Sequence, residues 1–99
     1  MSTSTSIAEL LESSPEIRSG RPCITGTGIP VHRIAIWHNM GMSPESIAVQ
    51  IPHRNLAQVH AALAYYFANQ AHIDTEIASD LAEAERLERE ALAAARLSA

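Results

Sequence analysis

The residues from Cys23 to Pro30 are the part of this sequence that most resembles a cofactor-binding motif. They read CITGTGIP, and a Gly-x-Gly stretch can present backbone amides to a phosphate group. A dinucleotide loop also needs a third glycine after a buried strand, and a Walker loop needs lysine followed by Ser or Thr. The chain has no lysine and no third glycine at this spacing. We therefore interpret Gly26 and Gly28 as a bend between an extended segment and a helix.

Histidine and cysteine residues are the other candidates for chemistry. His32 and His38 are six residues apart, and His53 and His60 are seven apart, whereas zinc ligands come in pairs at shorter spacing. Cys23 is the single cysteine, so it completes no tetrad and forms no internal disulfide. No helix start stands behind it to activate the thiol. We expect no metal, no cofactor and no enzymatic activity.

Polar residues at the start of a predicted helix have the chemistry of a nucleic-acid contact. In a helix-turn-helix, the first residues of the second helix meet the base edges. The DNA-binding candidates at this position are Arg54, Asn55, Gln58 and His60. Asn and Gln side chains form two hydrogen bonds with adenine, and an arginine can bind phosphate or guanine. The alternative is structural: Asn55 is a helix cap, and Arg54 and Gln58 are surface residues.

Start and stop signals predict three helices around these candidates. The first covers 31–40 and ends at Gly41, which suits the position just past a helix end. Ser43-Pro44-Glu45 begins a second helix with a hydroxyl cap, a proline and an acid, and Pro52 ends it. Asn55 caps the third. Its expected inner face consists of Leu56, Val59, Leu63, Tyr66 and Phe67, and its expected smooth far side consists of Ala61, Ala62, Ala64 and Ala68.

The segment before these helices contains extended residues and breaks. Residues 1–12 are expected to be flexible, with a short helical turn within 7–12. SGRP lies between Ile17 and Cys23–Ile24, which predicts a small β-hairpin or a pair of extended segments around a turn.

The last third of the chain predicts a long amphipathic helix from Thr75 to Leu97, capped by Asp74 or Thr75. It would span about 35 Å, too long to fold back on a small unit. Its apolar stripe needs a partner, which is a second copy or a different protein. The alternative is a frayed, solvated tail. The partner-binding candidates are Ile77, Leu81, Ala84, Leu87 and Arg89.

Composition and charge support one helical domain with an acidic end. The chain has 99 residues, 46% of them apolar, and a net charge of −4. Residues 1–60 are neutral, with four Arg and four Glu, so the excess lies in 61–99, where three Arg meet seven acids. This balance argues against a strongly cationic nucleic-acid surface. No run suits a secretory leader or a membrane helix, so we expect a cytoplasmic protein without a membrane partner.

Residues 13–69 resemble the domain-of-unknown-function family 433, a group of small bacterial and archaeal proteins. The resemblance is carried in order by PEI at 15–17, GRPCITGTGIPV at 20–31, GMSPESI at 41–47 and VHAALAYY at 59–66. Two residues depart from the family pattern: Gly28 replaces an arginine and Arg54 replaces a leucine. Members are similar to VapB-type antitoxins, carry a helix-turn-helix, and are often encoded beside a PIN-like ribonuclease.

Together these observations predict a mainly α protein with a short N-terminal β-hairpin, a three-helix helix-turn-helix (homeodomain-like) core and a long C-terminal helix. The expected organisation is a flexible segment 1–12, a domain 13–70 and a helical arm 71–99. The resemblance implies an antitoxin of a type II toxin-antitoxin system that binds a PIN-like toxin nuclease and its own promoter DNA, as a homodimer or higher homo-oligomer. The rival function is a self-assembling structural or interaction module with the same core and no DNA binding.

Overall fold

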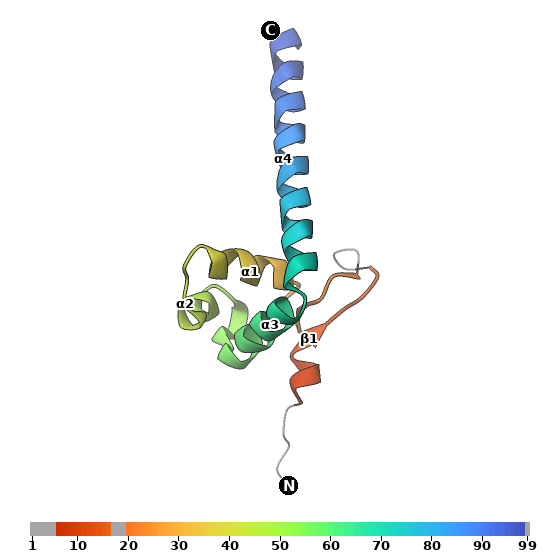
Figure 1. Cartoon of the computed structure of the whole chain (residues 1–99). Coiled ribbons are helices and arrows are strands. Elements are labelled where there is room, and N and C mark those ends of the chain that lie inside the picture. The colour runs from red at the N-terminus through yellow and green to blue at the C-terminus, as the bar shows by residue number, and fades with distance from the viewer. Residues whose placement is uncertain (1–5, 17–19, 99) are drawn as a thin grey trace. The chain divides into compact units, whose positions relative to one another are not determined.

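The computed structural model describes residues 6–16 and 20–98, without the side chains of Arg54 and Ser98, and forms two units. The second unit, Gln70–Ala99, contains the single long helix α4 (Gln70–Ser98). The first unit, Met1–Asn69, contains short elements that Figure 1 shows in sequence colours. They are η1 (Ile7–Glu9), β1 (Leu11–Glu12), β2 (Cys23–Ile24), α1 (Val31–Asn39), α2 (Pro44–Val49), η3 (Pro52–Arg54) and α3 (Leu56–Ala68).

The predicted hairpin is present, but its first strand lies earlier in the chain than expected. β1 pairs antiparallel with β2, with Leu11 opposite Ile24. The predicted strand at Ile17 lies outside the described residues. The short helical turn expected within 7–12 is present as η1, and β1 follows it. Ser6 caps η1 through a reciprocal capping box with Glu9, and β1 pairs with β2.

Helices α1, α2 and α3 form where local signals predict them. Gly41, at φ 94°, follows the end of α1. Glycine adopts this left-handed backbone conformation at little energetic cost. The Ser43 hydroxyl accepts a hydrogen bond from the Ser46 amide at 3.1 Å, and Pro44 is the first residue of α2. The turn before α3 contains His53 at φ 68°, the single non-glycine residue with positive φ in the described part of the chain.

The core of the first unit lies where α3 packs against α1, α2 and β2. Its fully buried side chains, at 0% exposure, are Ile24, Val31, Ile34, Ala35, Ile47, Val59 and Ala62. The expected inner face of α3 is partly wrong, because Leu56 is 39% and Phe67 is 51% exposed.

The expectation that Ala61 and Ala62 lie on a smooth far side of α3 is also wrong. Ala62 is fully buried in the core, and Ala61, about 100° around the helix from it, is only 9% exposed. Ala61 has low exposure because β1 packs against α3, and Ala61 lines a groove together with Ile7 and Leu10 of the N-terminal segment. Ala64 and Ala68 are exposed, as expected.

The predicted long C-terminal helix is confirmed, but it begins at Gln70 rather than at Thr75. Asn69, at φ −131° and ψ 31°, separates it from α3. Asp74 and Thr75 are therefore interior residues and not caps. The Thr75 hydroxyl donates to the Ala71 carbonyl at 2.9 Å, a bond four residues back that satisfies the side chain within a helix. No helix among the described residues is both long and apolar enough to cross a membrane.

Candidate functional site

Asn55 and Gln58 lie together at the start of α3, where the DNA contact is predicted. The Asn55 side-chain oxygen accepts a hydrogen bond from the Gln58 backbone amide at 3.1 Å, which makes Asn55 the N-cap. The cap satisfies one of the amides that a helix start leaves open. The structural role that the sequence offered for Asn55 is therefore present, and it engages the side-chain oxygen of this residue with the helix start.

The Gln58 side chain is held by a bond to a distant part of the chain. Its Nε2 donates to the Thr25 carbonyl at 3.1 Å, and Thr25 belongs to the bend between β2 and α1. Bidentate recognition of adenine needs both the donor and the acceptor of the carboxamide. Gln58 would have to give up this internal bond before it could contact a base with both atoms.

His60 is not gathered with that pair in the described structure, and the side chain of Arg54 is outside it. His60 is exposed and lines an open groove of about 300 Å³, whose other walls are apolar. The groove is lined by Ile7, Leu10, Ala57, His60, Ala61 and Ala64. The backbone of Arg54 lies in η3, and its side chain is outside the described part of the structure. Of the four DNA-binding candidates, the structure brings together Asn55 and Gln58.

Replacing Asn55 by alanine should lower the free energy of unfolding by about 1 kcal/mol, because the Gln58 amide loses its capping acceptor. Asn55→Ser should retain most of that stability, since serine caps nearly as well. Urea denaturation followed by circular dichroism measures both variants. An equal loss in the two would contradict the capping role.

The bend at Gly26 and Gly28 is closed by the protein's own groups. Gly26, at φ 80°, donates its amide to a carboxylate oxygen of Glu12 at 3.2 Å. The Thr27 hydroxyl donates to the Ile24 carbonyl at 2.9 Å and accepts from the Ile29 amide at 3.0 Å. A phosphate at the Gly26 amide would have to displace a carboxylate and remain beside its negative charge. The geometry is that of a structural bend.

Cys23 and His38, two further residues that could take part in chemistry, are packed within the first unit. Cys23 is 2% exposed, and its thiol lies 3.5 Å from the Arg21 carbonyl. His38 is half-buried and packs its ring edge-on against Phe67, with centroids 5.3 Å apart. In the part of the chain that the structure describes, no three His, Cys, Asp or Glu residues are grouped to hold a metal ion.

The second candidate site is the apolar stripe of α4. Leu81 and Leu87 are 59% and 52% exposed, although both are large aliphatic residues. Ala84 and Arg89 are also exposed, and Ile77 is half-buried. The helix thus presents most of the predicted partner-binding residues to solvent.

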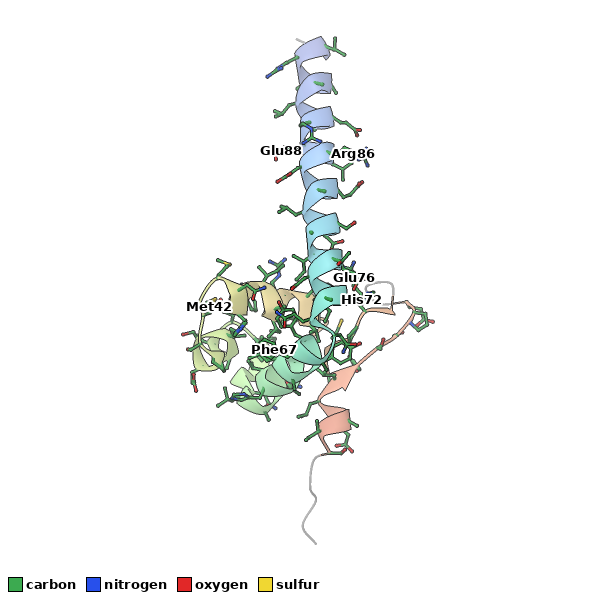
Figure 2. All side chains as sticks on the ribbon, viewed as in Figure 1. Met42, Phe67, His72, Glu76, Arg86 and Glu88 are labelled. Atoms are coloured by element: carbon green, nitrogen blue, oxygen red, sulfur yellow. The ribbon has the colours of Figure 1, made fainter. Side chains whose placement is uncertain are left out.

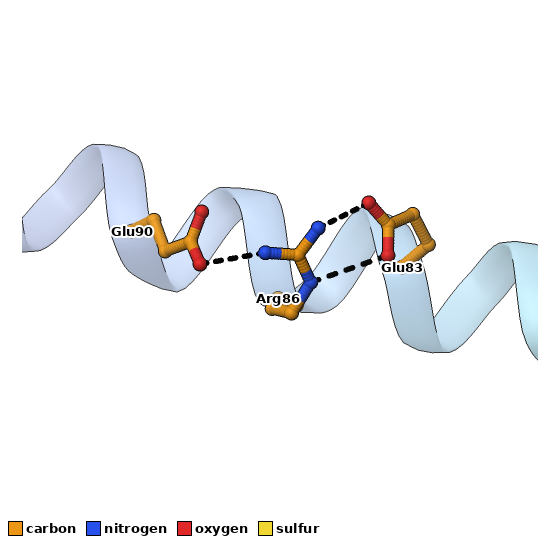
Figure 3. A network of polar contacts seen from close by, with 3 residues as sticks. All are labelled: Glu83, Arg86 and Glu90. Atoms are coloured by element: carbon orange, nitrogen blue, oxygen red, sulfur yellow. Dashed lines mark hydrogen bonds and ion pairs between the residues drawn. The ribbon is translucent and has the colours of Figure 1, made fainter.

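An ion-pair network lies on the opposite side of α4 from this stripe. Arg86 contacts the carboxylates of Glu83 and Glu90, with 2.7 Å between its Nη1 and the Glu90 oxygen (Figure 3). Glu83 first, and then Glu90, raise the pKa of Arg86 above its ordinary value. Ion pairs at spacings of three and four residues join neighbouring turns and stabilise the helix.

Two features of the site were not predicted: the groove wall formed by Ile7 and Leu10, and the internal bond of Gln58. The spacing Ile7-x-x-Leu10-Leu11 was a weak apolar signal for the first. Nothing local in the sequence indicates the second, because Thr25 lies 33 residues before Gln58.

These elements define a class of small, mainly helical proteins in which a two-stranded hairpin precedes a three-helix unit of the helix-turn-helix type. The chain belongs to the family described as "Protein of unknown function (DUF433)", whose model matches residues 6–66. It is similar to the crystal structure of a DUF433 member protein from Anabaena variabilis ATCC 29413. That match has 27% identity and a TM-score of 0.64, and covers 71% of this chain and 69% of the other. No curated protein matches this chain.

Proposed function

We propose that this protein is an antitoxin-like adaptor in which α4 binds and neutralises a PIN-like ribonuclease. The observation that carries the proposal is the exposed stripe of α4, with Leu81 59% and Leu87 52% exposed on a helix of 29 residues. Amphipathic helices of this kind bind by laying their apolar face into a hydrophobic groove. The resemblance of the rest of the chain to VapB-type antitoxins supplies the class of partner.

The charge of α4 agrees with that class of partner. The helix holds all seven acids and all three arginines of residues 61–99, a net charge of −4. An RNA-cleaving enzyme must bind a polyanion, so the groove that receives RNA is basic. An acidic helix is complementary to such a groove and would compete with RNA for it.

The second part of the proposal is that the start of α3 binds promoter DNA through Arg54, Asn55, Gln58 and His60. Support comes from the start of α3, where the helix dipole and backbone amides favour a phosphate, and from the residue types. The geometry requires Gln58 to exchange its bond to Thr25 for a base. The same bond, and the apolar groove beside His60, favour the second candidate function, a self-assembling or interaction module that binds no DNA.

Neutralisation is tested by co-expressing the chain with the PIN-like nuclease whose reading frame we expect to be encoded beside it. The two proteins should copurify, and addition of the adaptor should stop RNA cleavage by the isolated nuclease. Cleavage that continues at saturating adaptor, or a gene neighbourhood without such a reading frame, would contradict the proposal.

DNA binding is tested by a gel shift with the upstream promoter. We expect saturable binding that weakens between low and moderate salt, because phosphate contacts release counterions. The double variant Arg54→Ala/Gln58→Ala should abolish the shift. The control Gln70→Ala/Arg96→Ala removes the same residue types from α4 and should leave it unchanged. Binding that survives the first double variant would remove this site assignment, and absence of binding by the wild-type chain would favour the interaction module.

A further inference from the structure

The stripe of α4 has a carboxylate at its centre. Glu88 follows Leu81 by seven residues and Ala84 by four, and it precedes Ala91 by three and Ala95 by seven. In a helix these spacings place all five residues along one line. Glu88 is exposed, and Figure 2 shows it on the side of α4 opposite Arg86.

No arginine of α4 shares this line. Arg86 is two residues from Glu88, which puts it across the helix, where Glu83 and Glu90 bind it (Figure 3). Arg89 and Arg96 follow Glu88 and Ala95 by one residue each, so they lie about 100° around the helix from the line. Glu85, which is exposed, lies on one flank of the line, about 60° from Glu88. Arg96 lies on the same flank, but it is eight residues, about 12 Å, along the helix from Glu88.

Two copies of α4 therefore cannot pair through this stripe without burying an uncompensated carboxylate. In a parallel pair, Glu88 would meet Glu88 of the other copy, and two carboxylates at one site repel. In an antiparallel pair, it would meet an apolar residue or another acid. An ionised carboxylate is removed from water at high cost unless a cation or several donors replace the water.

We propose that α4 docks in an apolar groove of a different protein that places an arginine or lysine against Glu88, and that Glu88 prevents two copies of α4 from pairing. This inference rests on the proposed function and specifies its partner: the nuclease groove has apolar walls for Leu81 and Leu92 and a cation between them. A cation that binds RNA phosphate has the chemistry needed to bind Glu88.

The first test concerns self-pairing and uses the full chain without any partner. Glu88→Leu completes an apolar line from Leu81 to Ala95, so sedimentation velocity should show self-association at least tenfold tighter than in the wild-type chain. Glu90→Leu makes the same substitution on the other side of α4 and leaves Arg86 bound to Glu83, so it should sediment as wild type. If Glu88→Leu also sediments as wild type, Glu88 does not prevent pairing and the inference is overturned.

The second test concerns the cation in the partner. Glu88→Arg should bind the copurified nuclease at least tenfold more weakly than wild type, whereas Glu90→Arg should bind within about twofold of it. Equal binding by the two variants overturns the inference and leaves the proposed function intact. Failure of the wild-type chain to bind the nuclease overturns the proposed function and this choice of partner, while the sedimentation result still decides whether Glu88 prevents pairing.

Discussion

Tyr66→Ala is expected to lower the free energy of unfolding of the first unit by about 3–5 kcal/mol. Tyr66 is 1% exposed, and its ring centroid lies 5.2 Å from that of Phe67 and 6.5 Å from that of His38. Its hydroxyl accepts a hydrogen bond from Asn39 Nδ2 at 3.1 Å. The substitution leaves a cavity at the contact of α3 with α1 and an amide without its acceptor. A unit of this size has a total stability of roughly 3–10 kcal/mol, so the variant should be unfolded in a large fraction of the molecules.

The neighbouring residue provides a matched control for Tyr66. Tyr65 is the same residue type on the same helix but is 39% exposed, so Tyr65→Ala should cost well under half as much. Tyr66→Phe keeps the ring and removes the hydroxyl that accepts from Asn39, and the loss of that bond should cost about 1 kcal/mol. Urea denaturation of the three variants gives the comparison. Similar losses for Tyr65→Ala and Tyr66→Ala would contradict the packing described for α3.

The double substitution Leu81→Asp/Leu87→Asp is expected to weaken binding to the proposed nuclease by 100-fold or more. Burial of each leucine in a partner groove contributes about 1.5–3 kcal/mol, and a factor of ten in affinity corresponds to about 1.4 kcal/mol. Both leucines are more than half exposed in the free chain, so the variant should fold normally. Isothermal titration calorimetry measures the affinity, and circular dichroism measures the retained helix.

The control for this double variant introduces the same charges elsewhere on α4. Ser79→Asp/Ala93→Asp places two aspartates at exposed positions on the side away from the stripe. Its affinity should stay within a few fold of wild type, apart from a general effect of net charge. If both double variants lose binding to the same extent, charge and not the stripe governs the interaction.

Local signals were sufficient to predict most helix boundaries of the first unit. Gly41, Ser43-Pro44 and Asn55 act through the backbone groups next to them, so their effects follow from the adjacent sequence. Val59, Leu63 and Tyr66 of α3 are buried as predicted for the same reason, since a helix turns residues at apolar spacing to one face.

Contacts between distant segments account for what the sequence did not predict. Ala61 is buried because β1 packs against α3, and nothing near Ala61 in the sequence indicates that contact. The start of α4 at Gln70 was also not predicted. Asp74 and Thr75 are good caps in isolation, but the helix had already begun at Gln70, where it leaves them in its interior.

The candidate sites show the same division. The exposed positions of Leu81 and Leu87 along α4 follow from helical spacing, which is a local property. The hydrogen bond of Gln58 was not predicted, because its partner is the carbonyl of Thr25, 33 residues earlier in the chain. The hydrogen bonds that a side chain already makes within the protein are therefore a better guide to whether it contacts DNA than its residue type alone.

Thr25 uses all three of its polar groups to join segments that are far apart in the chain. Its amide donates to the Leu10 carbonyl at 3.1 Å, its hydroxyl donates to the Glu9 carbonyl at 2.7 Å, and its carbonyl accepts from Gln58. A chain trimmed at its beginning would lose the first two of these supports. The third bond, from Gln58 to the Thr25 carbonyl, would then be made to a less well held loop. Shortening the N-terminus would therefore weaken a contact at the start of α3, although the removed residues lie far from α3 in the sequence.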